Sequence, residues 1–262
     1  MSRSSSLTFP PNLSTPLTPY LPAPKSPSSP DPLPFVTLTY ASSLDSQLSL
    51  APGVRTTLSG LLSKAMTHHL RTHHAAILIG VNTALADDPA LNSRLENTPL
   101  SKQPRPIILD PRGRWGFTGE SKVIRLASRR EGKGPFVVVG EGIEVDEERK
   151  RVLEGVGGKY LKVKLGADGR FDWGDVLRLL KGEGLDSVMV EGGGEVINTL
   201  LGGEGNKYVD SVVVTIAPTW LGKGGVVVSP PREEGQKKQL RLKDVVWVPC
   251  GEDVVLCGRV EG

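Results

Sequence analysis

A stretch around residue 190 combines the pattern of a buried strand, a glycine turn and an amphipathic helix. Residues 188–190 are Val-Met-Val, the apolar run that a strand buried on both faces shows. Glu191 and three consecutive glycines follow. In the next segment the apolar side chains fall on one helix face, at positions 196, 197, 200 and 201. The chain is therefore expected to leave a strand, turn on glycine and enter a helix.

Such a turn has two interpretations. Glycines carry no side chain, so a phosphate can approach the backbone closely, and the free N–H groups at a helix start favour an anion. Many strand-to-helix turns, however, contain glycine for geometry alone, and a single glycine-rich turn is a weak motif. Taken alone, residues 192–194 leave both interpretations open.

Length and composition restrict the class of protein. A chain of 262 residues holds one large α/β domain or two small ones. Its formal net charge of +3 is compatible with a small anionic ligand and too weak to indicate nucleic-acid binding. No apolar run approaches the roughly 18 residues of a membrane span. Cys250 and Cys257 lie in apolar segments without metal-type spacing, which predicts buried, reduced thiols and a cytoplasmic protein.

Residues 1–34 differ from the rest of the chain. They are crowded with serine, threonine and proline and have almost no periodic apolar pattern. Residues before proline are disfavoured in helices, so this segment is predicted to be a disordered tail. One compact domain is expected from residue 35 to residue 262.

The domain begins with alternating strand and helix patterns. Strands are expected at residues 35–40, 75–81 and 107–109, and a helix at 58–74. The helix carries all four histidines, and two of them are spaced i, i+4, as on a metal-binding helix face. Since no third ligand is apparent, no metal site is expected.

The loop after the second strand is rich in groups that bind polar ligands. Thr83 offers a hydroxyl, Asp87 offers a carboxylate, and Arg94 can hold a phosphate through two parallel hydrogen bonds. Ligands of open α/β sheets bind at the carboxyl ends of strands, where this loop lies. The alternative is that the Asp-Asp-Pro sequence simply starts a turn.

Several motifs in order resemble one family. They are F-V-T-L-T-Y-A-S-S-L-D, S-K-A-M-T-H-H-L-R, A-I-L-I-G-V-N-T-A-L-A-D-D-P-A-L-N-S-R, I-I-L-D-P and V-M-V-E-G-G-G-E-V-I. Together they resemble the reductase of riboflavin biosynthesis in its free-standing fungal form. The resemblance implies a dihydrofolate-reductase-like α/β fold, with a mixed, mostly parallel sheet flanked by helices. It also implies a homodimer that uses NADPH to reduce 2,5-diamino-6-ribosylamino-4(3H)-pyrimidinone 5′-phosphate to the ribitylamino compound.

The resemblance also assigns site residues. It implies substrate contacts for Ser63, Leu91, Arg94 and Glu191, with Arg94 on the phosphate and Glu191 near the amino groups of the pyrimidine. Asp45 is a candidate for the catalytic proton donor. The cofactor contacts that it implies are Thr83, Asp87, Gly192, Gly193, Gly194, Glu195 and Val196.

This chain departs from the family pattern at three places. It has Ser46 and Gln47 where the family usually has glycine and a basic residue, and Ala75 where aspartate is usual. Residues 60–62 are Gly-Leu-Leu where Gly-Pro-Glu is usual. These departures keep open a nucleotide-binding protein without turnover. A second alternative is a reductase of folate-like pterins with the same fold, and Arg94, Glu191 and the Asp-Asp-Pro sequence weigh against it.

Overall fold

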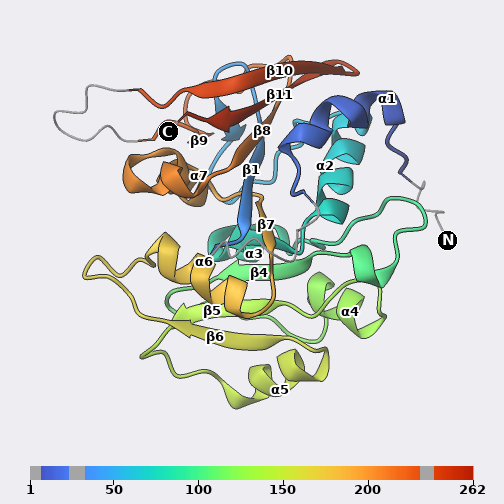
Figure 1. The fold of residues 1–262 in the computed structure, drawn as a ribbon. Helices are drawn as coiled ribbons and strands as arrows, with labels where there is room; N and C mark the ends of the chain where they lie inside the picture. Colours follow the sequence, from blue (N-terminus) through green and yellow to red (C-terminus); the bar gives the residue numbers. More distant parts are fainter. Residues whose placement is uncertain (1–6, 24–32, 231–238, 262) are drawn as a thin grey trace.

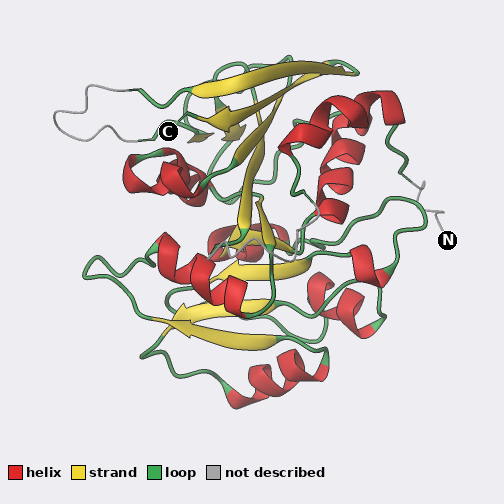
Figure 2. Cartoon of the chain, in the orientation of Figure 1, coloured by secondary structure: helices red, strands yellow, loops and turns green. Residues whose placement is uncertain are grey.

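The computed structural model describes residues 7–23, 33–230 and 239–261 (Figure 1). A nine-stranded sheet runs through the molecule, and helices cover both of its faces (Figure 2). In spatial order its strands are β10 (Leu242–Cys250), β11 (Asp253–Val260), β8 (Ser211–Ile216), β1 (Phe35–Ser42), β7 (Ser187–Val190), β3 (Ala76–Gly80), β4 (Arg105–Leu109), β5 (Phe136–Gly140) and β6 (Lys159–Val163).

The strands from β8 to β6 are parallel, and β11 and β10 extend the sheet with antiparallel pairs. The predicted mixed, mostly parallel sheet flanked by helices is therefore confirmed. A second, small sheet pairs β2 (Gln47–Ser49) with β9 (Val226–Val227).

Most helices connect successive strands, as parallel pairing requires. In α5 (Glu147–Gly155) and α6 (Trp173–Gly182), the side chains of Asp146 and Asp172 accept hydrogen bonds from backbone N–H groups of the first turn. The helices are α2 (Leu61–His73), α3 (Val81–Asp87), α4 (Lys122–Ser128), α5 (Glu147–Gly155), α6 (Trp173–Gly182) and α7 (Gly194–Leu201), with α1 (Pro11–Ser14) and the 3₁₀ turns η1 (Thr15–Tyr20), η2 (Leu100–Lys102) and η3 (Gly203–Tyr208).

The order of the strands creates a crevice. The chain crosses from β1 to β3 through α2 and leaves a place between them, which β7 fills after the chain has formed β4, β5 and β6. It then crosses through α7 to β8, on the other side of β1. The two connections diverge at the carboxyl ends of β1, β7 and β3, and ligands of α/β sheets bind where connections diverge in this way.

Alternate residues of the central strands build the core on the two faces of the sheet. In β3, Leu78 packs with residues of α6 and α7, whereas Ile77 and Ile79 pack with residues of α4 and α5 on the opposite face. This period of two fixes the register of β3, because a shift by one residue would exchange the two faces.

The N-terminal segment packs against the domain. Leu17, Tyr20 and Leu21 are buried, in one apolar cluster with residues of α2, β10 and β11. The Tyr20 hydroxyl donates a hydrogen bond to the Asp244 carbonyl. The predicted disordered tail is therefore wrong for residues 7–23, because a few apolar side chains find a matching surface that composition does not reveal. Residues 1–6 and 24–32 of that tail lie outside the described part of the chain.

The two cysteines have the environment predicted from the sequence. Cys250 and Cys257 are free and buried, and burial raises the pKa of the Cys257 thiol to about 12. None of the described helices has the length and apolar character that crossing a bilayer requires.

Candidate active site

A cavity of about 1520 Å³ opens at the carboxyl ends of the central strands. Tyr40 and Ala41 of β1, Ile79 and Gly80 of β3, and Glu191 after β7 contribute to its lining. Strand order alone predicts a ligand site at this point, so the cavity is the candidate active site.

The glycine turn forms one wall of the cavity. β7 ends at Val190 and α7 begins at Gly194, as predicted. Gly192 and Gly193 have φ values of +115° and +84°, in a region that residues with a side chain rarely adopt. Gly194 is required for packing, because a Cβ there would lie 2.3 Å from Cγ1 of Val226. Gly193 also leaves the first N–H groups of α7 free of any side-chain cap.

Helix α3 lies beside this turn. Residues 81–87 are helical, so the prediction that this segment is entirely a loop is wrong. Thr83 and Asp87 line the cavity, one helical turn apart. A Cβ on Gly193 would lie 3.3 Å from Oγ1 of Thr83, which shows how closely α3 approaches the turn. The structure thus brings together the residues that the sequence assigned to the cofactor, Thr83, Asp87 and 192–196.

One face of α2 forms another part of the lining. Lys64, Thr67, His68 and Arg71 all line the cavity and follow the helical spacing i, i+3, i+4, i+7. His68 and Arg71 were not predicted from the sequence as site residues. The helical spacing of these polar residues could have indicated them. The apolar stripe of the same helix, which packs on the core, is the stronger pattern in this segment.

Arg71 holds Glu191 in a two-point ion pair. Its Nε donates to Oε1 of Glu191 at 2.7 Å and its Nη2 to Oε2 at 2.5 Å. The two side chains are only 13% and 14% exposed, and Nη1 of Arg71 also donates to the Asn92 carbonyl at 2.8 Å. Glu191 reaches the cavity as predicted, but both of its oxygens already accept from the guanidinium.

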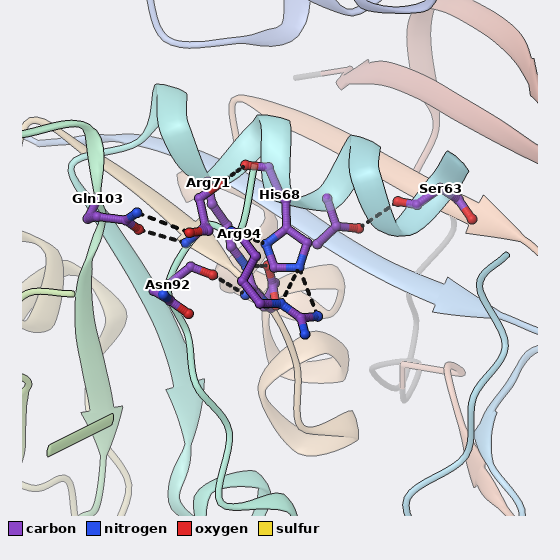
Figure 3. Close-up of polar contacts among 9 residues, drawn as sticks. Ser63, His68, Arg71, Asn92, Arg94 and Gln103 are labelled. Carbon is purple, nitrogen blue, oxygen red and sulfur yellow. Dashed lines mark hydrogen bonds and ion pairs between the residues drawn. The ribbon is translucent and has the colours of Figure 1, made fainter. Parts of the chain in front are cut away.

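Arg94 lies at the edge of the His68 ring, and Figure 3 shows its guanidinium beside one of the ring nitrogens. Its backbone N is 3.1 Å from Nδ1, and its Nε and Nη2 are 3.3 and 3.2 Å from Nε2. Burial, together with the charges of Arg71 and Arg94, lowers the pKa of His68 to about 3, and a hydrogen bond with the Asn92 carbonyl partly opposes the shift. His68 is therefore a neutral imidazole at physiological pH.

The segment around Arg94 is anchored by neighbouring polar groups. The Gln103 amide accepts from the Ser93 backbone N–H at 2.7 Å and donates to the Ser93 carbonyl at 3.0 Å (Figure 3). Leu91 is buried beside this segment and lines the cavity. The structure thus brings Leu91, Arg94 and Glu191 to the same cavity.

Ser63 is not brought to the cavity. It is absent from the lining and donates a hydrogen bond to the buried carboxylate of Asp253, which also accepts from the Gly60 N–H at 2.8 Å. Asp253 thus satisfies the start of α2 from the β10–β11 turn. Ser63 lies on the side of α2 that this turn covers, so its expected position near the substrate is wrong.

Asp45 is also outside the lining. Its carboxylate accepts from the Ser43 hydroxyl at 2.5 Å and from the backbone N–H groups of Leu221 and Gly222 at 3.1 and 2.8 Å. The hydrogen bond from Ser43 is the main reason why the pKa of Asp45 is below its ordinary value. An ionised carboxylate that joins two loops does not have the position or the proton expected of a catalytic acid.

The described residues contain no cluster of three or more side chains suited to a metal ion. His69 and His73, the i, i+4 pair, instead have ring centroids 4.4 Å apart in a tilted contact.

Comparison with known proteins identifies the family. A family model of the RibD C-terminal domain matches residues 34–256. The chain belongs to this family. The match includes the whole cavity lining and the residues of both of its walls.

Fungal reductases are among the similar members of the RibD C-terminal family. The chain is 46% identical over 251 residues to the 2,5-diamino-6-ribosylamino-4(3H)-pyrimidinone 5′-phosphate reductase of Eremothecium gossypii, covering 93% of this chain and 94% of that protein. The reductase of the same name from Saccharomyces cerevisiae is 43% identical, with 87% of each chain covered.

Solved structures of the family agree with the fold. The riboflavin biosynthesis reductase of Saccharomyces cerevisiae superposes with a TM-score of 0.76 at 38% identity, covering 95% of this chain and 100% of that one. RibD of Acinetobacter baumannii gives 0.70 at 25% identity, over 88% of this chain and 59% of that one. The fold implied by the sequence motifs, a mixed and mostly parallel sheet flanked by helices, is shared with these reductases.

Proposed function

We propose that this chain reduces 2,5-diamino-6-ribosylamino-4(3H)-pyrimidinone 5′-phosphate to the ribitylamino compound with NADPH, as a step of riboflavin biosynthesis. The observation that carries the proposal is one cavity with two different walls. One wall is a glycine turn at a helix start, suited to a dinucleotide phosphate, and the other presents Arg94 and Arg71. Fungal relatives that carry this reductase name cover nearly the whole chain, which supports the same assignment.

The glycine wall fits the cofactor. Positive φ at Gly192 and Gly193 exposes backbone N–H groups to the cavity without a side chain in the way. Thr83 and Asp87 offer hydrogen-bonding groups on the adjacent helix, and residues 195–196 continue the wall. When bound, NADPH supplies the hydride. Arg112 and Arg114 also line the cavity and are suited to the additional phosphate that distinguishes NADPH from NADH.

The other wall is proposed to hold the substrate. Arg94 provides the charge for the phosphate, and Leu91 provides an apolar surface. Glu191 can accept hydrogen bonds from the amino groups of the pyrimidine through its remaining lone pairs, in the orientation that Arg71 fixes. This arrangement positions the sugar between the two walls, and positioning is the main contribution that such a reaction needs.

The reaction requires little acid–base catalysis from ionisable side chains. Opening of the ribosylamine ring gives an imine at the first carbon of the sugar, and this carbon accepts the hydride. The electron pair of the C=N bond moves to the nitrogen, which then takes a proton. Because Asp45 is an ionised acceptor outside the cavity lining, water is the proton source in this proposal.

A homodimer in the cytoplasm is part of the same proposal. The edge strand β10 exposes Val245 and Trp247, which are 40% and 56% accessible. Apolar side chains on a sheet edge are suited to a symmetric contact with a second copy. The mass of the protein in solution, measured by light scattering, tests this part.

Consumption of NADPH with and without the phosphorylated pyrimidine tests the function. Wild-type protein and Arg125→Ala, which removes an exposed arginine of α4 outside the cavity, are expected to turn over equally. Arg94→Ala is expected to lose at least about tenfold in kcat/KM. NADPH binding without turnover would support a non-catalytic nucleotide-binding protein, and reduction of dihydrofolate instead would support a pterin reductase.

The cofactor wall has a separate test. Gly193→Ala places a Cβ in a left-handed conformation beside Thr83 and is expected to weaken NADPH binding about tenfold. Gly142→Ala is the matched control, because Gly142 has open space around it and is outside the cavity. Equal NADPH affinities of the two variants, measured by fluorescence titration, would contradict the assignment of this wall.

A further inference from the structure

His68 has hydrogen-bond donors facing both of its ring nitrogens. The backbone N–H of Arg94 points to Nδ1 at 3.1 Å, and the Arg94 guanidinium lies 3.2–3.3 Å from Nε2. A neutral imidazole has one acceptor nitrogen and one N–H donor, so it can satisfy only one of these two approaches. One of the two contacts must therefore join a donor to a donor.

The backbone decides which nitrogen accepts. The Arg94 N–H has a fixed direction, and leaving it unpaired in this part-buried place would cost the full penalty of an unmade hydrogen bond. The guanidinium is different, because it has five donors, a flexible side chain and access to solvent. Nδ1 is consequently the acceptor, and the hydrogen is on Nε2.

This tautomer places several donors beside one protein acceptor, the Asn92 carbonyl, which already accepts from Nη1 of Arg71 at 2.8 Å. The N–H at Nε2 and the Nε and Nη2 groups of Arg94 converge within 3.3 Å. His68 is 5% exposed and lines the cavity, so its Nε2 has little access to bulk water. An anionic oxygen that accepts from both side chains would resolve the opposition of donors.

The charge balance of the wall also calls for an anion. Glu191 neutralises Arg71 through their two-point ion pair. No carboxylate among the described residues forms an ion pair with Arg94. One uncompensated positive charge thus lies beside one neutral N–H donor, at the same wall of the cavity.

We propose that His68 is a phosphate-binding residue, which donates from Nε2 to the same phosphate group of the substrate that Arg94 holds. This inference rests on the proposed function, since the phosphate is that of the ribosylaminopyrimidine. His68 has a double role in it: Nδ1 fixes the backbone of Arg94, and Nε2 completes the anion site.

The rest of the wall supports this geometry. The His68 carbonyl accepts from the Ser93 hydroxyl at 2.9 Å, and Gln103 holds Ser93 through two hydrogen bonds. These bonds connect α2 directly to residues 93–94 (Figure 3). The two donors are therefore pre-organised for a ligand, which lowers the entropic cost of binding it.

Two substitutions of His68 test the roles of the two ring nitrogens separately. His68→Asn keeps an acceptor near the position of Nδ1 and removes the donor at Nε2. His68→Gln keeps an amide donor near Nε2 and removes the acceptor at Nδ1. The measurement is the ratio of kcat/KM for the phosphorylated substrate to kcat/KM for the same compound without its phosphate, with NADPH affinity as a control on each variant.

His68→Asn is expected to lower this ratio about 10- to 100-fold, chiefly through KM, while NADPH affinity is unchanged. His68→Gln is expected to retain most of the preference for the phosphorylated compound. An unchanged ratio in His68→Asn would overturn the proposal. An equal loss in both variants would also overturn it, because His68 would then only anchor the backbone of Arg94.

A measurement on the wild-type protein avoids any effect of substitution on folding. Nitrogen NMR of the histidine ring identifies the protonated nitrogen, and titration with ribose 5-phosphate follows its response. A hydrogen on Nε2 whose signal shifts on titration supports the proposal, whereas a hydrogen on Nδ1 or an unresponsive signal refutes it. If wild-type protein binds ribose 5-phosphate in this way but does not oxidise NADPH, the proposed function fails and the phosphate site stands.

Discussion

Replacing Arg71 with methionine removes the cation that neutralises Glu191 at the wall of the cavity. Two unit charges about 4 Å apart attract by about 4 kcal/mol at an effective dielectric constant of about 20. The two side chains are only 13% and 14% exposed, so solvent screens the pair weakly. Breaking a buried pair by removing one partner costs about 3–5 kcal/mol, because the other charge stays buried and unpaired.

We therefore expect Arg71→Met and Glu191→Gln each to lower the free energy of unfolding by about 3 kcal/mol. The second substitution in the double variant removes a charge that no longer has a partner. The double variant should consequently lose about 4 kcal/mol, which corresponds to a coupling energy of about 2 kcal/mol.

Urea unfolding of the wild type, the two single variants and the double variant measures the coupling energy. The slope of the unfolding free energy against urea concentration must be equal in all four proteins. A coupling energy below about 0.5 kcal/mol would refute the reasoning, because it would mean that the pair is solvated and contributes only as surface charges do. Arg125→Ala is again the control, since this exposed arginine has no ion pair among the described contacts.

Three further predictions concern stability. Leu17→Ala is expected to cost about 2–5 kcal/mol in urea unfolding, because this side chain is 1% exposed, and no effect would mean that the N-terminal segment is not docked in solution. Asp253→Asn should lower the unfolding free energy by about 1–3 kcal/mol by weakening its bonds to the start of α2, whereas Glu252→Gln at the neighbouring exposed position should not. Burial lowers the pKa of His74 to about 4, so between about pH 6.5 and pH 4 the unfolded chain binds a proton that the folded chain does not. The free energy of unfolding should therefore fall by up to about 3 kcal/mol as the pH decreases through this range. His74→Gln should reduce this fall.

The sequence by itself determined the local parts of the fold. The strand, glycine turn and helix from 187 to 201 were predictable, because a run of buried apolar residues, the backbone freedom of glycine and a helical stripe are all encoded within a few residues. The cavity residues Thr83, Asp87 and Arg94 were also found from sequence, since their motif is contiguous.

The tertiary structure decided which polar side chains face the cavity. Ser63 and Lys64 are neighbours in α2, yet Ser63 turns to Asp253 and Lys64 lines the cavity. Asp45 follows a strand that ends at the site, but its partners are backbone groups of residues 221–222. These partners are more than a hundred positions away in sequence, so no local sequence pattern predicts them.

The same reason accounts for Arg71, Glu191 and the N-terminal segment. The ion pair joins residues 120 positions apart, and only the insertion of β7 between β1 and β3 brings them together. Composition describes residues 7–23 as a solvated tail, but their burial depends on a surface formed by α2, β10 and β11. Local sequence sets conformation through backbone preferences, whereas the partner of a side chain is set by the order in which distant strands join the sheet.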